Sequence, residues 1–257
     1  MAIVPGQSEM TGNLLANNPA AARRQPLLIS FSGLDGSGKS TQIEQLLIAL
    51  HNAGLHTRTL AFWDNVVVGV RYREGFVHRV YKSERGIGAP GKPVNRRDKN
   101  MRGWHLTLAR HFLYLADAIN LRRVVEHEKR KAATGGTRTV IVLDRYIYDE
   151  LANLNLRNPL SRAFVQMVRS LAPEPDLAFL LDADPVAAHA RKPEYPVDFM
   201  QQCRKAYFDL AMELGNITVI PPLGLPEAIA EVHKTAEQML AASGNSVELR
   251  RENSKVA

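Results

Sequence analysis

Apolar runs alternate with amphipathic stretches along most of the chain. A short apolar run bounded by turn residues predicts a buried β-strand, whereas apolar residues three and four positions apart predict a helix with one buried face. The strand pattern occurs at residues 26–33, 56–63, 139–143, 175–185 and 217–220, with a turn at the end of the fourth run. The helix pattern occurs at residues 39–53, 104–131, 160–172, 196–214 and 225–242.

The longest predicted helix, at residues 104–131, carries apolar residues that we assign to one side. They are Leu106, Phe112, Leu113, Leu115, Ala116, Ile119, Val124 and Val125. A helix with an apolar side packs that side against the core of its domain. We therefore expect these residues to face the core.

Strands that alternate with helices connect as right-handed βαβ units and form a parallel sheet. The pattern predicts an α/β fold with three layers, in which a doubly wound, five-stranded parallel sheet lies between two layers of helices. In sheets of this kind, ligands bind at the carboxyl ends of the strands. We therefore look for functional residues just after each predicted strand.

The composition is that of a globular protein. Of the 257 residues, 45% are hydrophobic, which is enough to build a buried core. The single cysteine, Cys203, cannot form an internal disulfide, and no apolar run approaches the roughly 18–20 residues that span a bilayer. We expect one cytoplasmic domain at residues 26–242 that makes no membrane contact, with a flexible leader at residues 1–25 and a flexible tail at residues 243–257.

The positive charge of the chain is concentrated in one segment. Residues 64–102 contain ten Lys and Arg against four Asp and Glu, a local excess of +6 in a chain of formal net charge +7. A field of this kind attracts phosphates, nucleic acid or an anionic membrane. Ordinary surface charge on a solvated loop explains the same composition, so both interpretations stay open.

A glycine-rich segment follows the first predicted strand and precedes the first predicted helix. The sequence GLDGSGKS at residues 33–40 matches the phosphate-loop pattern G-x-x-x-x-G-K-[ST] at every fixed position. Backbone N–H groups of such a loop surround phosphate oxygens, Lys39 reaches the β- and γ-phosphates, and the Ser40 hydroxyl binds Mg²⁺. A bare strand-to-helix turn requires neither side chain. The residues expected to bind ATP are Gly33, Leu34, Asp35, Gly36, Ser37, Gly38, Lys39, Ser40 and Thr41.

An acidic residue ends the third predicted strand. Asp144 follows the apolar run TVIVL, and a carboxylate at a strand's carboxyl end can bind Mg²⁺ directly or through water. The alternative is that Asp144 caps the helix that follows it. Given the phosphate loop, we favour a metal site formed by Ser40 and Asp144.

Further motifs accompany the loop in a defined order. Asp144-Arg145-Tyr146 follow the third strand, PDLAFLLDADP lies at residues 175–185, and CRKAYFDLA lies at residues 203–211. Together with GLDGSGKST, these motifs resemble the thymidylate kinase family over about residues 26–240. The resemblance implies a P-loop kinase domain that transfers the γ-phosphate of ATP, with Mg²⁺, to a nucleoside monophosphate.

The resemblance also implies roles for individual residues. In the family, Asp35 lies near the acceptor and the metal, Arg145 contacts the acceptor phosphate, and a mobile lid supplies arginines to the transition state. The lid corresponds here to residues 191–196, with Arg191 and Lys192 as its charges. The residues expected to be catalytic are Lys39, Asp35, Arg145 and Arg191.

The acceptor side departs from the family pattern. The family has arginines at the positions of Asp64 and Ala118. It has small polar residues and then a tyrosine at the positions of Asp149, Glu150 and Asn153. Two basic groups are therefore missing, and two acids face the expected position of an anionic nucleotide.

We hypothesise that the enlarged basic segment at residues 64–103 replaces the missing arginines, and the first candidates are Arg71, Arg73, Arg96 and Arg97. Asp149 or Glu150 could then hydrogen-bond sugar hydroxyls or exocyclic amines of the acceptor. Tyr114 stands where the family has an aromatic residue that stacks on thymine, and a core position on its long helix explains it equally well. The residues expected to bind the acceptor are Arg145, Tyr114, Arg71, Arg73 and Asp149.

Three functions remain open at this point. The first is a nucleoside monophosphate kinase of nucleotide biosynthesis, which converts dTMP and ATP to dTDP and ADP or acts on a related acceptor. The second is a P-loop kinase for another acceptor, a nucleoside or a sugar phosphate. The third is a non-catalytic nucleotide-binding or nucleic-acid-binding module, against which Lys39, Asp144 and the lid charges argue. The expected partner is thus a small-molecule phosphate acceptor rather than nucleic acid, and the resemblance implies a homodimer formed through the long helices.

Overall fold

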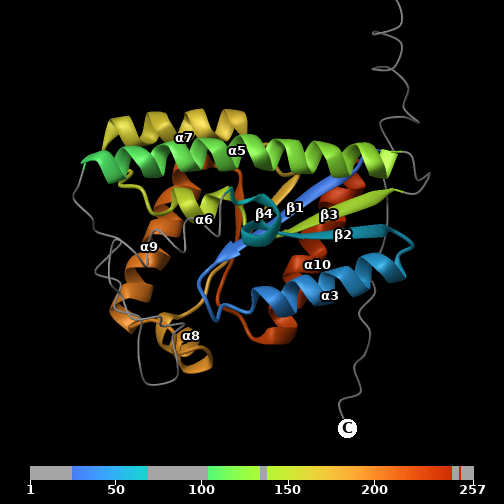
Figure 1. Cartoon of the computed structure of the whole chain (residues 1–257). Coiled ribbons are helices and arrows are strands. Elements are labelled where there is room, and N and C mark those ends of the chain that lie inside the picture. Colours follow the sequence, from blue (N-terminus) through green and yellow to red (C-terminus); the bar gives the residue numbers. More distant parts are fainter. Residues whose placement is uncertain (1–24, 69–103, 134–137, 245–248, 250–257) are drawn as a thin grey trace, which may run out of the picture.

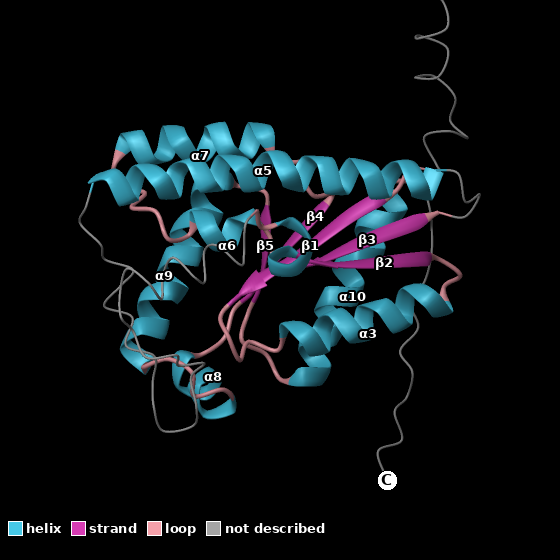
Figure 2. Ribbon diagram, in the orientation of Figure 1, coloured by secondary structure: helices cyan, strands magenta, loops and turns pink. Residues whose placement is uncertain are grey.

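The computed structural model describes residues 25–68, 104–133, 138–244 and 249. In this part of the chain, five parallel strands form one sheet in the order β2-β3-β1-β4-β5. Helices cover both faces of the sheet (Figures 1 and 2). The doubly wound, three-layer α/β fold expected from the sequence is confirmed.

The elements follow one another as the sequence pattern predicts. The strands are β1 (Leu27–Gly33), β2 (His56–Ala61), β3 (Thr139–Asp144), β4 (Leu177–Leu181) and β5 (Ile217–Ile220). The helical elements are α3 (Lys39–Asn52), the π-helical turn η1 (Phe62–Val66), α5 (Trp104–Ala133), α6 (Ile147–Leu151), α7 (Pro159–Leu171), α8 (Pro185–Arg191), α9 (Val197–Leu214) and α10 (Leu225–Ala242).

Alternate residues of the central strands enter two separate cores, because successive side chains of a strand point to opposite faces. On β1, Leu28 packs in the core shared with α5, α6, α7 and α9, whereas Ile29 packs in the core shared with α3 and α10. Burial on both faces fixes the register, since a slip by one residue would exchange the faces. In this register Phe31 of β1 lies opposite Asp144 of β3. The loops that follow β1 and β3 therefore leave the sheet side by side.

Strand β2 is shorter than the sequence pattern predicts. It ends at Ala61, whose N–H donates to Asn65 Oδ1 over 2.8 Å. The next residues form a π-helical turn, in which Val67 N–H donates to the Phe62 carbonyl over 3.0 Å. The prediction that Phe62 and Trp63 continue the strand is wrong, because the neighbouring strand β3 ends at Asp144, the register partner of Ala61, and offers no further residues for β2 to pair with.

The predicted inner side of α5 is wrong in part. Phe112, Leu113 and Ile119 were expected to face the core, yet 63%, 37% and 41% of their side chains are exposed. The buried residues of this helix follow a spacing of three and four, and they are Tyr114, Asp117, Ala118, Leu121 and Val125. The buried stripe includes a carboxylate, which a search for apolar residues passes over. Asp117 Oδ1 accepts a hydrogen bond from Val68 N–H over 2.8 Å, which offsets the cost of its burial.

Two short helices are missing from those that periodicity predicts, and α8 had a recognisable start signal. The alternative role considered for Asp144 assumed a helix after it, which is present as α6, but the residue that caps this helix is Tyr146 and not Asp144. Helix α8 begins with Asp184, whose side chain accepts a hydrogen bond from Ala187 N–H over 2.9 Å, followed by Pro185 at the first helical position. Both are standard helix-start residues. Helix α6 has only five residues, too few for a periodic pattern. Both helices follow strands at their carboxyl ends, where they adjoin the phosphate loop.

In the described residues, no helix combines the length and the apolar character needed to cross a membrane. Of the tail predicted at residues 243–257, residues 243, 244 and 249 are described, and Leu249 is buried in the core beneath α3 and α10. The leader at residues 1–25 and the basic segment at residues 64–103 lie outside the described residues, except for residue 25 and residues 64–68.

Replacing Leu121 by alanine is expected to destabilise the fold, because its side chain is fully buried on α5. A Leu→Ala change at such a site typically costs about 2–5 kcal/mol of unfolding free energy. The matched control is Leu160→Ala on α7, where the side chain is 78% exposed and the expected change stays within about 0.5 kcal/mol. Urea denaturation measures both, and equal effects of the two substitutions would contradict the described packing of α5.

Candidate active site

The loop between β1 and α3 is shaped by close backbone contacts at two glycines. A Cβ atom on Gly33 would lie 2.5 Å from the carbonyl oxygen of Leu181, and one on Gly36 would lie 2.5 Å from the carbonyl oxygen of Ala188. Gly36 also has φ +81°, a conformation that other residues rarely adopt. The phosphate loop therefore packs directly on the end of β4 and on the backbone of α8, with no room for side chains between them.

Lys39 is buried at the start of α3 and turns back into the loop. Its Nζ donates hydrogen bonds to the carbonyl oxygens of Gly33 over 2.9 Å and of Leu34 over 2.7 Å. Burial lowers the pKa of Lys39 to about 8, and repulsion from Arg145 adds to that effect, while Asp149 and nearby carboxylates oppose it. The ammonium group is thus held inside the loop and loses its proton more readily than an exposed lysine.

The other side chains of the loop are consistent with a phosphate ligand. Ser37 Oγ is buried and has no hydrogen-bond partner among the described residues. Ser40 is exposed and Thr41 is half-buried on the first turn of α3, where the helix N-terminus presents free backbone N–H groups. A hydroxyl without a partner beside a helix N-terminus matches the needs of an anion with several oxygens.

Asp144 ends β3 at the same edge of the sheet. It lies opposite Phe31 of β1 and Ala61 of β2 in register, and its attraction helps to keep Lys39 protonated. The described residues contain no cluster of three or more His, Cys, Asp and Glu that could hold a metal by themselves. Mg²⁺ at a nucleotide site needs only one or two protein oxygens, with phosphates and water supplying the rest. A hydroxyl from Ser40 and a carboxylate from Asp144 fit that requirement.

Arg145 leaves the sheet with an unusual backbone. Its φ is +67°, the only positive value at a non-glycine residue in the described chain, and its N–H donates to the Phe31 carbonyl over 2.9 Å. Strain of this kind is found at functional sites and persists where surrounding contacts hold it. The turn directs the side chain toward the phosphate loop, where Nη2 donates to Asp35 Oδ1.

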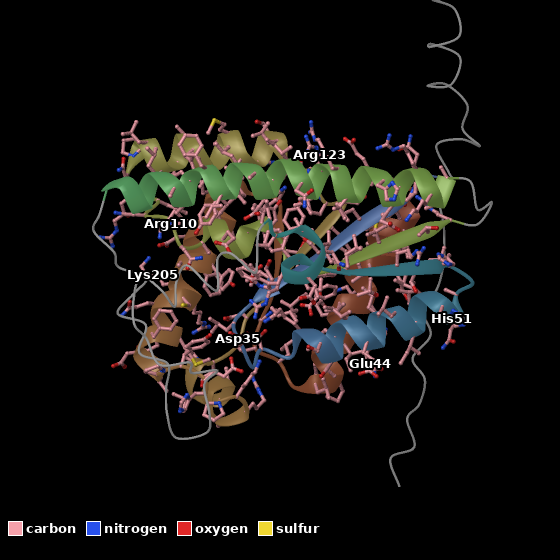
Figure 3. All side chains as sticks on the ribbon, in the orientation of Figure 1. Asp35, Glu44, His51, Arg110, Arg123 and Lys205 are labelled. Atoms are coloured by element: carbon pink, nitrogen blue, oxygen red, sulfur yellow. The ribbon has the colours of Figure 1, made fainter. Side chains whose placement is uncertain are left out.

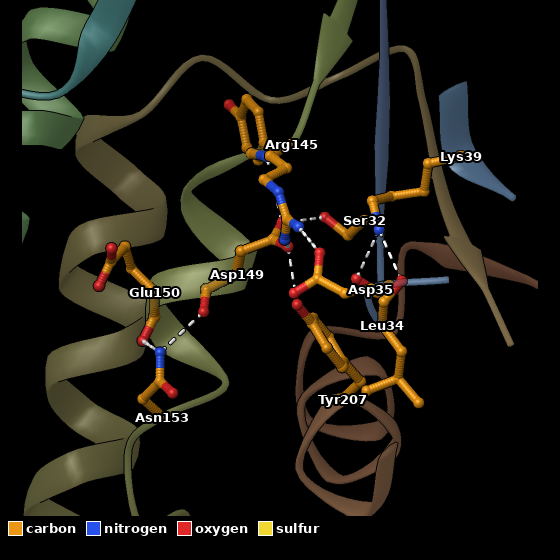
Figure 4. A network of polar contacts seen from close by, with 11 residues as sticks. Ser32, Leu34, Asp35, Lys39, Arg145, Asp149, Glu150, Asn153 and Tyr207 are labelled. Atoms are coloured by element: carbon orange, nitrogen blue, oxygen red, sulfur yellow. Dashed lines mark hydrogen bonds and ion pairs between the residues drawn. The ribbon is translucent and has the colours of Figure 1, made fainter. Parts of the chain in front are cut away.

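Asp149 holds the other end of the Arg145 guanidinium (Figure 4). Its Oδ1 accepts hydrogen bonds from Arg145 Nη1 over 3.0 Å and from the Tyr207 hydroxyl over 2.7 Å. Its Oδ2 accepts from the Ser32 hydroxyl over 2.7 Å and from Tyr146 N–H over 3.2 Å. One carboxylate thus joins the end of β1, the turn after β3, the start of α6 and the middle of α9.

The two carboxylates determine the charge state of this network. Burial raises the pKa of Asp35, but Arg145, Lys39 and Lys192 outweigh that effect and hold the pKa below its usual value. Burial lowers the pKa of Arg145, and attraction by Asp149 and Asp35 more than offsets it, so that the pKa is raised. Asp35 and Arg145 are therefore both charged at neutral pH, and their side chains are 22% and 23% exposed.

Arg191, expected to be a lid residue, lies at the end of α8 against the phosphate loop. Its Nε donates a hydrogen bond to the Gly36 carbonyl over 2.8 Å. The predicted lid at residues 191–196 therefore begins with the last residue of a helix, and the following charge, Lys192, pairs with Glu194 over 3.1 Å. Figure 3 shows Asp35 of the same loop at the opposite end of α3 from His51.

The expected acceptor residues have different surroundings. Arg145 and Asp149 belong to the network described above, and Arg71 and Arg73 lie outside the described residues. Tyr114 is only 4% exposed and packs in the core beneath α5. Ala118, at the position of a family arginine, is fully buried in the same core.

Sequence reasoning missed two members of the network. Ser32 immediately precedes the glycine-rich pattern, and Tyr207 lies within CRKAYFDLA, but nothing near either residue predicts a bond to Asp149. These contacts span 117 and 58 residues along the chain. A second pair joins the same motif to the carboxyl end of β4, since Arg204 donates to both oxygens of Asp182 over 2.6 Å.

The geometry brings a lysine and two arginines to the loop between β1 and α3. The phosphate loop with Lys39 offers donors for a triphosphate, while Arg145 and Arg191 approach the same loop from β3 and α8. Transfer of a phosphoryl group depends mainly on positioning and on positive charge around it. This arrangement can supply both.

Comparisons with known proteins agree with this geometry. No protein-family model matches the chain. A probable thymidylate kinase of Pyrobaculum aerophilum is 30% identical to it over 217 residues, which cover 79% of this chain and 91% of that protein. A thymidylate kinase of Solidesulfovibrio magneticus is 29% identical over 225 residues, covering 80% and 95%, and a probable thymidylate kinase of Methanocaldococcus jannaschii is 26% identical over 215 residues, covering 80% and 92%. The chain therefore belongs to the thymidylate kinase family, as a divergent member.

Proposed function

We propose that this protein is a phosphotransferase that moves the γ-phosphate of ATP to a nucleoside monophosphate, with dTMP as the first acceptor to test. The relatives named thymidylate kinases support this class of reaction. The observation that carries the proposal is the placement of Lys39 inside the phosphate loop while Arg145 contacts Asp35 of that same loop. A cradle for the donor thus adjoins a cation available to the acceptor.

On the donor side, Gly33 to Thr41 surround the phosphates of ATP, and Lys39 lies against the β- and γ-phosphates. Ser40 and Asp144 hold Mg²⁺, which supplies positive charge to the transferring group when it is bound. The unpaired hydroxyl of Ser37 then gains a phosphate oxygen as its partner.

On the acceptor side, Arg145 positions the acceptor phosphate and Arg191 adds charge from α8. Each of the two guanidinium groups retains N–H groups that the described contacts do not use, since a guanidinium has five. The roles assigned to Asp35, Arg145 and Arg191 are part of this proposal.

A kinase for another acceptor, a nucleoside or a sugar phosphate, is the second candidate. The observation that favours it is the charge around Arg145, whose single positive charge already lies between Asp35 and Asp149. Asp64 and Ala118 stand where the family has further arginines. If the acceptor is a monophosphate, the basic segment at residues 64–103 is the proposed source of the missing charge.

The outer side of α5 supports a homodimer. Leu108, Phe112, Leu113 and Ile119 are exposed along it, which is more apolar surface than a solvated helix needs. We therefore retain the proposal that two copies associate through this helix.

The proposed reaction can be tested on a panel of acceptors. In the presence of ATP and Mg²⁺, the protein is expected to phosphorylate at least one of dTMP, dUMP, dCMP, dAMP and dGMP, as measured by ADP release and by chromatography of the product. Excess EDTA is expected to stop the reaction, because the phosphates then lose their counter-ion. Faster turnover of a nucleoside or a sugar phosphate would favour the second candidate. Absence of turnover on every acceptor would contradict a kinase.

The proposed roles of the two arginines can be tested by substitution. Arg145→Ala and Arg191→Ala are each expected to lower kcat/KM at least about tenfold, since a charge-assisted hydrogen bond contributes about 1.5–3 kcal/mol. The matched control is Arg162→Ala on α7, where the side chain is exposed and lies in a helix that does not contribute to the site. Equal losses in all three variants would show that the effect does not depend on the site.

The lowered pKa of Lys39 predicts that nucleotide binding depends on pH. The free protein is expected to bind a non-hydrolysable ATP analogue with Mg²⁺ about tenfold more weakly at pH 9 than at pH 7, because Lys39, whose pKa burial lowers to about 8, becomes neutral over that range. Isothermal titration calorimetry at pH 7, 8 and 9 measures the affinity. Lys39→Met should bind weakly with little change over the same range. An affinity of the wild-type protein that stays constant up to pH 9 would contradict the assignment.

A further inference from the structure

Donors within the protein occupy all the hydrogen-bond acceptor positions of the Asp149 carboxylate. A carboxylate has about four lone-pair sites for hydrogen bonds. Arg145, Tyr207, Ser32 and the Tyr146 N–H occupy that number at 2.7–3.2 Å, and the side chain is only 4% exposed. No lone pair remains for sugar hydroxyls or exocyclic amines of an acceptor. The role expected for Asp149 from the sequence, direct contact with the acceptor, is therefore not the one its geometry favours.

Asp149 and Asp35 compete for the same cation. Arg145 donates Nη1 to Asp149 and Nη2 to Asp35, so each carboxylate takes one end of the guanidinium (Figure 4). A guanidinium and a single carboxylate prefer to pair through two parallel hydrogen bonds. With Asp149 absent, Asp35 would remain as the adjacent anion and would take both ends. Arg145 would then be drawn onto the phosphate loop.

We propose that Asp149 is a positioning residue of the acceptor site, which keeps Arg145 from pairing with Asp35 alone. Tyr207 and Ser32 hold the carboxylate in turn, so its position depends on α9 and β1 and not only on its own short helix. Arg145 is thereby fixed at the junction of the donor and acceptor sites, with its remaining N–H groups directed by two anions. This inference rests on the proposed function, because it assigns Arg145 to the acceptor.

A structural role alone would have a different signature. Asp149 also accepts a hydrogen bond from Tyr146 N–H at the start of α6, so its loss will lower stability in any case. Lower stability reduces the amount of folded protein and with it the maximal rate, but it leaves both Michaelis constants unchanged. A misplaced Arg145 affects the acceptor, whereas the contacts of Lys39 with the loop remain. The ratio of the two Michaelis constants therefore separates the two roles.

The test compares Asp149→Asn and Tyr207→Phe with the wild-type protein, using dTMP and ATP with Mg²⁺ in steady-state kinetics at pH 6. This pH lies well below the Lys39 pKa of about 8, so that losing the attraction of Asp149 does not neutralise Lys39. In Asp149→Asn, we expect KM for dTMP to rise about tenfold to hundredfold and KM for ATP to change less than about twofold. Tyr207→Phe keeps the carboxylate and removes one of its donors, so a rise of about two- to tenfold in KM for dTMP is expected. If Asp149→Asn does not fold, as judged by urea denaturation, Tyr207→Phe decides.

The matched control is Asp176→Asn, which removes a carboxylate whose Oδ2 accepts a hydrogen bond from Leu28 N–H over 2.7 Å at the other end of β1. Neither Michaelis constant should change in this variant by more than about twofold. Michaelis constants that rise together in Asp149→Asn, or that both stay at their wild-type values, would overturn the proposal. A control that raises KM for dTMP as much as Asp149→Asn would overturn it as well.

Calorimetric titration of the wild-type protein with dTMP separates this proposal from the function on which it rests. Binding of dTMP without turnover would refute dTMP as the acceptor, and Asp149 would then be judged by the same tenfold criterion on dTMP affinity. Turnover of dTMP by the wild-type protein with unchanged constants in both variants would refute the role of Asp149 alone. If dTMP neither binds nor is turned over, the same comparison is made with the acceptor that the panel shows to be turned over fastest, and absence of turnover on every acceptor would refute both proposals.

Discussion

The candidate site depends on one cation shared by two carboxylates. Arg145 lies between Asp35 of the phosphate loop and Asp149 of α6, and these three side chains carry a net charge of −1. Burial alone would disfavour each charge, whereas their contact helps to lower the pKa of Asp35 and to raise the pKa of Arg145, which favours the ionised form of both. The loop after β1, the turn after β3 and, through Tyr207, helix α9 are joined at this point. Removing Arg145 would leave two neighbouring carboxylates without their cation, whereas removing either carboxylate would leave one balanced ion pair.

The sheet makes this contact possible. β1 pairs with β3 on one side and with β4 on the other, so three strands end at neighbouring positions. The phosphate loop follows β1, the Asp144-Arg145 turn ends β3, and helix α8 comes after β4. These three segments are far apart in the sequence. Gly33 and Gly36 then allow the phosphate loop to approach the backbones of Leu181 and Ala188. The parallel register of the strands, together with glycine at positions 33 and 36, thus brings three separate segments to one site.

The sequence was sufficient to predict the features that depend on local pattern. Alternating runs predicted all five strands of the described sheet, and the sequence GLDGSGKS predicted the phosphate loop. Each of these patterns lies within a short stretch of consecutive residues. The buried side of α5 could not be found by searching for apolar residues, since the buried stripe includes Asp117. The partners of Asp149 could not be found either. Ser32 and Tyr207 approach it only after the sheet and α9 have formed, and no spacing records such a contact.

The charges of Asp35, Arg145 and Asp149 also explain why the phosphate donor is easier to assign than the acceptor. In the proposed function, Lys39 and the loop N–H groups form a site for a polyanion within a few consecutive residues. The acceptor would approach Arg145, whose charge two carboxylates already exceed, so a dianionic phosphate would need further positive charge close by. Arg191 would be one source, although its Nε is directed to the Gly36 carbonyl. On this proposal, the charge that an acceptor can carry depends on how many further cations lie near Arg145.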